Sequence, residues 1–279
     1  MKTTFIRNKP YAGPVQGVIL DWAGTAVDYG CVGPVAVFTH VFKKSGVKVS
    51  TAEARMFMGL TKKDHIRKMC ELSSVSGQWR RIYGRTPSET DVDNLYEETE
   101  PMMVSTVARY ADPIPGLLDT LETLRKRGIK IGSTTGYTSP IMEKLIPAAR
   151  DRGYDPDAVV CPSDAPAGRP YPWMCYQNAI ELEIYPLEAM VKIGDTVNDI
   201  HEGLNAGMWT IGLTKSGNGL GLTEEEVEKT DPEELKTRLE TIEQELLDSG
   251  AHYTAEGIWE CLPIIDDIND RLSRGEQPL

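Results

Sequence analysis

An aspartate at the end of an apolar run is the first residue of this chain that could do chemistry. The run spans residues 17–20 (GVIL), and Asp21 is followed by the turn residues Gly24 and Thr25. Such a run is typical of a buried parallel strand, and open α/β sheets bind ligands at the carboxyl edge of their strands. A carboxylate there can be a nucleophile, a metal ligand or both, or it can simply cap the following turn.

Three later strand ends carry polar side chains of complementary kinds. The segment 133–136 (STTG) offers hydroxyls that suit phosphoryl oxygens, and Arg169 places a cation in a loop rich in Pro and Gly. Asp195 and Asp199 follow the next apolar run. Facing Asp21, they would form a hard oxygen site suited to Mg²⁺. Each signal is weak alone, because such residues often cap helices or face solvent, but their order along the chain favours a shared site.

The elements that must position these residues alternate along the chain. We expect strands over residues 17–21, 129–133, 158–161, 190–194 and 209–213, and helices over 117–127, 139–152, 173–182 and 198–206. This alternation predicts an α/β fold with a doubly wound parallel sheet covered on both faces. We expect the acidic tail from Glu224 to be helical, and Tyr171 and Trp173 to lie in the core.

A helical insert follows the first strand. Residues 34–108 show helical patterns with no β-rich run, and Thr61 is a candidate N-cap. We therefore predict a catalytic core of residues 1–29 and 110–279 and a helical cap of residues 30–109, with residues 1–16 as a loose arm. A cap beside the catalytic edge would exclude water and complete the site.

Composition excludes several classes of protein. The net charge of -12 argues against nucleic acid and anionic membranes as partners. No apolar stretch approaches the roughly 18 residues that cross a bilayer, and the first residues show no apolar secretory signal. The five cysteines lack metal-site or disulfide spacing, so we expect reduced thiols and a cytoplasmic location.

The order of the strand-end motifs over residues 17–206 resembles the haloacid dehalogenase superfamily of phosphotransferases. The resemblance implies that Asp21 attacks phosphorus to give an aspartyl-phosphate that water hydrolyses. It implies that Thr135 and Arg169 bind the phosphoryl group, and that Asp195 with Asp199 forms the acidic pair beside Mg²⁺.

The sequence departs from the phosphatases of that superfamily at Ala23, where they usually carry an Asp that protonates the leaving alkoxide. Ala23 can still offer a backbone carbonyl to a metal. An alternative route to bond cleavage lies in the insert, where a lysine at 62 or 63 could form a Schiff base with a carbonyl substrate. The imine would accept electrons from a breaking phosphorus–carbon bond. His65 shares a helix face with Lys62 and could assist proton transfers.

A lysine on a helix is usually solvated, and its pKa of about 10.4 keeps it protonated. The Schiff-base role therefore requires burial or a neighbouring cation to lower that pKa. Lys63 and Arg169 are the candidate neighbours.

Four strings together resemble the phosphonatase family. They are DWAGTxVDYG from Asp21, MGLxKxDH from Met58, GSTTGYT from Gly132 and PAGRPYPWMCY from Pro166. The resemblance implies hydrolysis of phosphonoacetaldehyde to acetaldehyde and phosphate in phosphonate degradation, with Mg²⁺, by a homodimer. It assigns the Schiff base to Lys62 rather than Lys63.

Residues and resemblance together predict one site. Its catalytic residues are Asp21, Lys62, His65, Thr135 and Arg169. Its substrate-contacting residues are Gly24, Cys31, Met58, Gly59, Gly136 and Tyr137, although Cys31 and Met58 could also be plain packing residues. Its metal ligands are Asp21, the Ala23 carbonyl and Asp195, with Asp199 in support.

Three other readings stay open. A phosphatase or phosphomutase of the same superfamily would turn over phosphate esters without an imine. A lysine Schiff-base lyase would use Asp21 only to hold metal. A catalytically silent binding protein would keep the fold alone, but the intact set of Asp21, Thr135, Arg169 and Asp195 argues against it.

Overall fold

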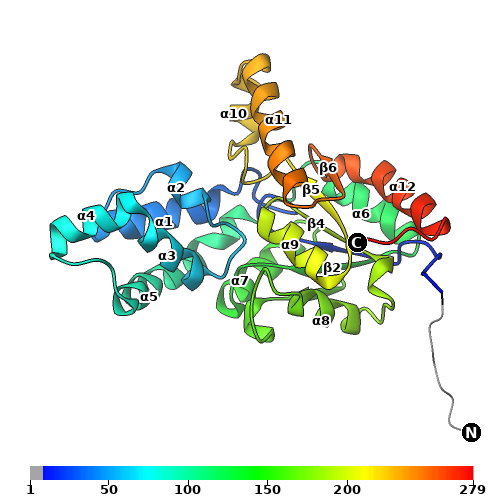
Figure 1. The fold of residues 1–279 in the computed structure, drawn as a ribbon, viewed down its shortest axis with the longest axis horizontal. Helices are drawn as coiled ribbons and strands as arrows, with labels where there is room; N and C mark the ends of the chain where they lie inside the picture. The colour runs from blue at the N-terminus through cyan, green and yellow to red at the C-terminus, as the bar shows by residue number, and fades with distance from the viewer. Residues whose placement is uncertain (1–8, 279) are drawn as a thin grey trace, which may run out of the picture.

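A six-stranded parallel sheet forms the centre of the molecule, with helices on both faces and a helical segment beside one edge (Figure 1). The structure is a computed structural model that describes residues 9–278. The strands are β1 (Gly17–Leu20), β2 (Lys130–Thr134), β3 (Ala158–Val160), β4 (Met190–Gly194), β5 (Trp209–Leu213) and β6 (Tyr253–Ala255). Their order is β3-β2-β1-β4-β5-β6, which confirms the predicted doubly wound parallel sheet.

The register of the sheet brings three strand ends together. Leu20, the last residue of β1, pairs with Ser133 of β2 and with Ile193 of β4. The chain order reverses between β1 and β4, and ligands of open α/β sheets bind at such a switch point. The segments that follow these strands therefore meet at one place.

Helices cover the two faces of the sheet, and the side chains of β1 alternate between them. Val18 and Leu20 pack with residues of α6 and α12, whereas Ile19 packs with residues of α8 and α9. The core helices are α6 (Leu117–Lys126), α7 (Ser139–Arg150), α8 (Trp173–Glu181), α9 (Val197–Ala206), α10 (Glu224–Lys229), α11 (Pro232–Asp248) and α12 (Cys261–Ser273). Figure 1 shows α10 and α11 projecting from this core.

The helical segment inserted between β1 and β2 confirms the predicted insert. Its helices are α1 (Val32–Lys44), α2 (Thr51–Arg55), α3 (Lys62–Glu71), α4 (Ser73–Tyr83) and α5 (Glu89–Thr106). The Thr61 hydroxyl accepts from the Asp64 amide and caps α3, as predicted. We call this segment the cap; its boundaries at residues 30 and 109 stay predictions.

The structure corrects two expectations about the core. Tyr171 and Trp173 are 57% and 41% exposed rather than buried, because they lie on the outward side of the loop and helix that cover β3. The tail is not wholly helical, since β6 adds a sixth strand. The predicted loose arm lies partly outside the described residues, in 1–8.

The cysteines and the lengths of the apolar helices bear on the expectations drawn from composition. All five cysteines are buried and free. Within residues 9–278, no helix has both the length and the apolar character needed to cross a membrane.

Candidate active site

A small cavity lies where the ends of β1, β2 and β4 meet the segment that leads into α3. Its free volume is about 20 Å³, which is room for roughly one water molecule. The lining residues are Asp21, Ala23, Cys31, Pro34, Met58, Gly59, Lys62, Thr135, Gly136, Tyr137, Arg169, Asp195 and Thr196. The cavity adjoins a groove of about 980 Å³, which shares Met58, Asp195 and Thr196 with its lining.

Most of the predicted site residues line this one cavity, although they come from distant parts of the chain. Gly24, His65 and Asp199 do not line it, and Pro34 and Thr196 line it without having been predicted. The structure thus brings the strand-end residues and the cap lysine to one place.

Asp21 follows β1 directly and is fixed by its own backbone. Its amide donates to the Ile193 carbonyl of β4 at 3.0 Å, which extends the sheet by one step. Its carboxylate, 6% exposed, lies 2.7 Å from Arg169 Nη2. Burial raises the pKa of Asp21, and the charge of Arg169 opposes that rise.

Arg169 is surrounded by carboxylates. Its guanidinium lies 2.7 Å from Asp21, 3.0 Å from Asp199 and 2.8 Å from Glu202. It also donates to the Thr134 hydroxyl at 2.8 Å. Burial alone would lower the pKa of Arg169, but these carboxylates raise it well above its usual range, so the group stays a cation.

Three buried aspartates form a candidate divalent-metal site. Oxygen atoms of Asp21, Asp195 and Asp199 lie within 4.8 Å of one another. Burial, and then the negative charges of Asp21 and Asp199, raise the pKa of Asp195 well above its usual value. A divalent cation with a preference for oxygen ligands would offset this repulsion, so the donor set fits such an ion.

Small residues and donors outside the sheet hold Asp195 in place. Its two oxygens accept from the Thr25 hydroxyl at 3.0 Å and from the Asn218 amide at 2.7 Å. Gly24 has φ +91°, and a Cβ there would lie 2.4 Å from Asp195 Oδ2. A larger residue at position 24 would displace the carboxylate. Gly24 thus acts on the site through Asp195.

Asp199 has both oxygens occupied. Oδ1 accepts from Lys192 Nζ at 2.9 Å and pairs with Arg169 at 3.0 Å, while Oδ2 accepts from Thr196. Burial would raise the pKa of Asp199, but Arg169 and Lys192 lower it below its usual value. The residue is therefore an ionised anchor for its neighbours.

Sequence reasoning missed two members of this cluster, Lys192 and Glu202, which are both fully buried. Lys192 Nζ lies 3.4 Å from Glu202, whose carboxylate also accepts from Thr134. Lys192 could have been found from the sequence, because it lies inside an apolar strand and a buried charge needs a partner. Glu202 lies three residues after Asp199 and so on the same face of α9.

Lys62 is the first residue of α3 and points into the cavity. It is 4% exposed, and its Nζ lies 4.6 Å from the centre of the Tyr137 ring. Burial lowers its pKa to about 8, and Cys31 and Asp21 resist that change. Lys63 instead pairs with Asp93 at 2.6 Å on the surface.

His65 lies behind the cavity rather than in it. The ring is fully buried, packs on Phe38 with centroids 4.1 Å apart and bonds the Ala54 carbonyl through Nε2 at 2.9 Å. Burial, and then the charge of Lys62, lower its pKa to about 3, so it is neutral. Nε2 must carry the proton in that bond, which leaves Nδ1 as an acceptor without a partner among the described residues.

Thr135 and Tyr137 follow β2 in a tight turn. The Tyr137 amide donates to the Thr135 hydroxyl oxygen at 3.1 Å, and both side chains are buried. The Thr135 hydroxyl proton is thereby free to donate into the cavity.

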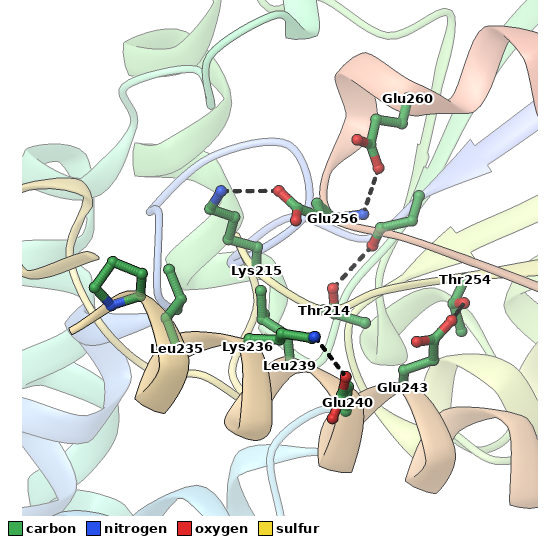
Figure 2. A pocket seen from close by; sticks show the side chains of 12 residues that line it. Thr214, Lys215, Leu235, Lys236, Leu239, Glu240, Glu243, Thr254, Glu256 and Glu260 are labelled. Carbon is green, nitrogen blue, oxygen red and sulfur yellow. Dashed lines mark hydrogen bonds and ion pairs between the residues drawn. The ribbon is translucent and has the colours of Figure 1, made fainter. Parts of the chain in front are cut away.

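A larger groove of about 450 Å³ lies between α11 and the end of β6, away from this cavity (Figure 2). Figure 2 shows both lysines of the groove paired with glutamates, Lys215 with Glu256 at 2.8 Å and Lys236 with Glu240 at 3.9 Å. No predicted site residue lines it. The groove therefore offers no clustered reactive groups.

Comparison with known proteins agrees with this geometry. The family model of the haloacid dehalogenase-like hydrolases matches residues 18–213. A solved structure from Oleispira antarctica, described as a phosphonoacetaldehyde hydrolase-like protein, superimposes with a TM-score of 0.95 at 39% identity and covers 99% of this chain and 100% of its own.

Two proteins of Syntrophobacter fumaroxidans are similar over almost the full length. A phosphonoacetaldehyde hydrolase and a phosphonoacetaldehyde hydrolase-like protein are each 57% identical over 274 residues, which are 98% of this chain and 99% of theirs. The chain therefore belongs to the haloacid dehalogenase-like hydrolases, and within them to the phosphonoacetaldehyde hydrolase family.

Proposed function

We propose that this chain hydrolyses the carbon–phosphorus bond of phosphonoacetaldehyde to give acetaldehyde and phosphate, in phosphonate degradation. The observation that carries the proposal is one small cavity that holds both a buried lysine, Lys62, and a buried aspartate, Asp21. Ala23 stands where an alcohol-leaving phosphatase would need an acid. A reaction that breaks a bond to carbon needs an electron acceptor instead.

Lys62 supplies that acceptor. Its pKa of about 8 gives a useful fraction of free amine at neutral pH, and the amine adds to the aldehyde carbon. Loss of water leaves a protonated imine between Lys62 and the substrate. The iminium lies β to the phosphorus, so it can take the electron pair of the carbon–phosphorus bond.

Asp21 then attacks phosphorus. The phosphorus–oxygen bond forms as the carbon–phosphorus bond breaks, which gives an aspartyl-phosphate and an enamine on Lys62. Protonation of the enamine carbon and hydrolysis release acetaldehyde and the free lysine. Water hydrolyses the aspartyl-phosphate, so the net reaction consumes one water and releases phosphate.

Arg169 and Thr135 bind the phosphoryl oxygens in this scheme. Arg169 is already fixed by three carboxylates, so it offers a cation that costs little reorganisation. Asp21, Asp195 and the Ala23 carbonyl would hold Mg²⁺, with Asp199 in support, and the ion would neutralise phosphoryl charge. The fit of the three aspartates to a hard cation supports this assignment.

Gly59 and Gly136 would let the backbone approach the substrate closely, whereas Gly24 would act through Asp195, and Cys31, Met58 and Tyr137 would form the wall around the two carbons of the substrate. The position of the last three on the cavity surface supports that role. His65 would move protons through its unpartnered Nδ1 once the cap opens or a water bridges the gap.

We further propose a cytoplasmic homodimer. The buried free thiols suit a reducing compartment. The exposed Tyr171, Trp173 and Ile180, on and beside α8, offer apolar surface that a second copy could cover. Light scattering on the purified protein would show about twice the chain mass of 30.9 kDa if this is right.

A matched pair of substrates tests the proposed reaction. Phosphonoacetaldehyde and glycolaldehyde phosphate both carry an aldehyde and a phosphoryl group, but only the second has an ester oxygen. We expect Mg²⁺-dependent release of phosphate and acetaldehyde from the first, with turnover of the second at least roughly 100-fold slower because no acid protonates its alkoxide. Faster turnover of the ester would move the chain to the phosphatase reading.

A further inference from the structure

The loop between β5 and α10 lies directly behind the carboxylate of Asp195. The Asn218 amide donates to Asp195 Oδ2 at 2.7 Å. A Cβ on Gly217 would lie 2.4 Å from Asp195 Cβ, so the loop backbone packs tightly against this side chain. Ser216 ties the same loop to the turn after β1, because its hydroxyl donates to the Gly24 carbonyl at 2.9 Å. The position of this loop therefore sets the position of a predicted metal ligand.

One cap residue, Arg55, forms hydrogen bonds with that loop. Arg55, the last residue of α2, donates through Nη1 to Asn218 Oδ1 at 3.1 Å and through Nη2 to the Gly221 carbonyl at 2.9 Å. In return, the Asn218 side-chain amide donates to the Arg55 carbonyl at 3.1 Å. Arg55 Nη1 also donates to the Gly30 carbonyl at 2.7 Å, in the linker between β1 and α1. A single side chain thus joins the cap, the linker and the loop.

The chain from Arg55 to Lys62 touches the core closely at two glycines, beside a groove of about 980 Å³ whose lining includes Arg55, Met58 and Asp195. A Cβ on Gly59 would lie 2.6 Å from Thr196 Oγ1, and one on Gly136 would lie 2.5 Å from the Leu60 carbonyl. The Asn198 amide group donates to the Met58 carbonyl at 2.7 Å. The segment that delivers the lysine is therefore held directly against the core by these contacts.

We propose that Arg55 and Asn218 are positioning residues that couple closure of the Lys62 segment to the orientation of Asp195. The proposal rests on the proposed function, because it gives Lys62 and Asp195 their roles. Closure draws Arg55 onto the loop, and the loop presents Asp195 to the cation site. By thermodynamic reciprocity, a cation that prefers the oriented Asp195 favours the closed cap. The two halves of the site are then assembled together rather than independently.

The test uses two measurements on full-length protein. The first is the rate at which borohydride traps phosphonoacetaldehyde on Lys62 in the absence of added metal. The second is the Mg²⁺ dissociation constant from calorimetric titration without substrate. In Arg55→Ala we expect the trapping rate to fall about tenfold and the Mg²⁺ dissociation constant to rise about tenfold. This is the size expected for the loss of a few polar contacts. Asn218→Ala keeps the backbone N–H that donates to Asp195. We therefore expect a smaller effect, with the trapping rate about threefold lower and the Mg²⁺ dissociation constant about threefold higher.

Arg238→Ala is the matched control. Arg238 Nη2 donates to the Leu220 carbonyl of the same loop at 2.8 Å, but it comes from α11 and makes no hydrogen bond or ion pair with the cap among the described residues. We expect it to lose thermal stability comparable to Arg55→Ala while keeping the wild-type trapping rate. The double variant of Arg55 and Asn218 should be no worse than Arg55→Ala, because the two act on one contact.

The outcomes separate this inference from the proposed function. No trapping in the wild-type protein would overturn the proposed function itself. Normal wild-type trapping, with Arg55→Ala changing stability only, or changing just one of the two measurements, would overturn the coupling. If Arg55→Ala does not fold, Asn218→Ala decides between the same outcomes.

Discussion

The strand-end half of the site holds Asp21, Arg169 and Asp199 in ion pairs, whereas the cap half contributes one amine, on Lys62, that has no ion pair within residues 9–278. Arg169 meets three carboxylates at 2.7–3.0 Å, and Lys192 meets two. The Nζ of Lys62 lies over the ring of Tyr137, 4.6 Å from its centre. The ion pairs keep the strand-end groups charged, whereas burial without an ion pair lowers the pKa of the Lys62 amine to about 8. Each arrangement suits one half of the proposed reaction.

The difference also concerns how each half is held. The strand ends are fixed mainly by the sheet register, and Asp195 is also held by the backbone amide of Asn218. Lys62 depends on contacts between the cap and the core, at Arg55, Gly59 and Gly136. Apart from the contact between Arg55 and Asn218, we therefore expect substitutions in the core to affect phosphoryl transfer and those in the cap to affect imine formation.

Asp21→Asn separates the two halves most strongly. Phosphate release should fall by at least roughly 10³-fold, because the nucleophile is gone. Lys62 should still form its imine, and borohydride should leave the phosphonate group attached to the reduced adduct. Mass spectrometry of the Lys62 peptide distinguishes this adduct from an ethyl group. An ethyl adduct in the variant would mean that Asp21 is not needed for bond cleavage.

Lys62→Met should stabilise the folded protein. The pKa of Lys62 falls from 10.5 to about 8 on folding, so the buried ammonium costs roughly 3 kcal/mol below pH 8. This cost shrinks as the pH rises from 8 to 10.5, because the unfolded chain then binds a proton that the folded chain does not. Chemical denaturation at pH 7 and pH 10 should show a large gain at the first and a small one at the second.

Lys63→Met provides the control for that measurement. Lys63 is half-exposed and pairs with Asp93 on the surface, so we expect a change within about 0.5 kcal/mol at both pH values. Equal effects of the two substitutions would contradict the assignment of a strained, buried amine to position 62.

Glu202→Gln probes the fixed half without touching the cavity. Arg169 would lose one of its three carboxylates, and we expect kcat to fall by roughly 10- to 100-fold. Trapping at Lys62 should stay near the wild-type rate. Glu181→Gln at the exposed end of α8 should leave both unchanged. A matching loss of trapping in Glu202→Gln would show that the halves are not separate.

The pH dependence of trapping tests the cap half alone. Only the free amine attacks the aldehyde, so the trapping rate should rise about tenfold per pH unit below pH 8 and level off above it. Single-turnover mixing at each pH, followed by a common borohydride quench, gives the midpoint. A midpoint near 10.5 would indicate a solvated lysine.

The apolar runs were enough to predict five of the six strands and the strand-end positions of Asp21 and Asp195, because strand ends are set by local pattern and topology. Lys62 could be chosen over Lys63 only through the family resemblance. The structure gives the physical distinction, since Lys62 lies inside at 4% exposure while Lys63 reaches a surface acid. Local pattern cannot tell which of two adjacent lysines faces inward.

The placements that the sequence did not predict depend on contacts between distant parts of the chain. Lys192 and Glu202 belong to the charged cluster because β4 and α9 pack together, and no motif marks that contact. His65 shares a helix face with Lys62, yet the packing of its ring on Phe38 keeps it out of the cavity lining. The strand β6 is short and has no apolar run, so a helical pattern on both sides of it concealed it.

Borohydride reduction in the presence of phosphonoacetaldehyde, followed by peptide mass spectrometry, tests the central claim most directly. We predict a stable adduct on the peptide that contains Lys62, with no adduct in Lys62→Ala. Phosphate release that proceeds without any adduct, or an adduct on another lysine such as Lys63 or Lys192, would contradict the account.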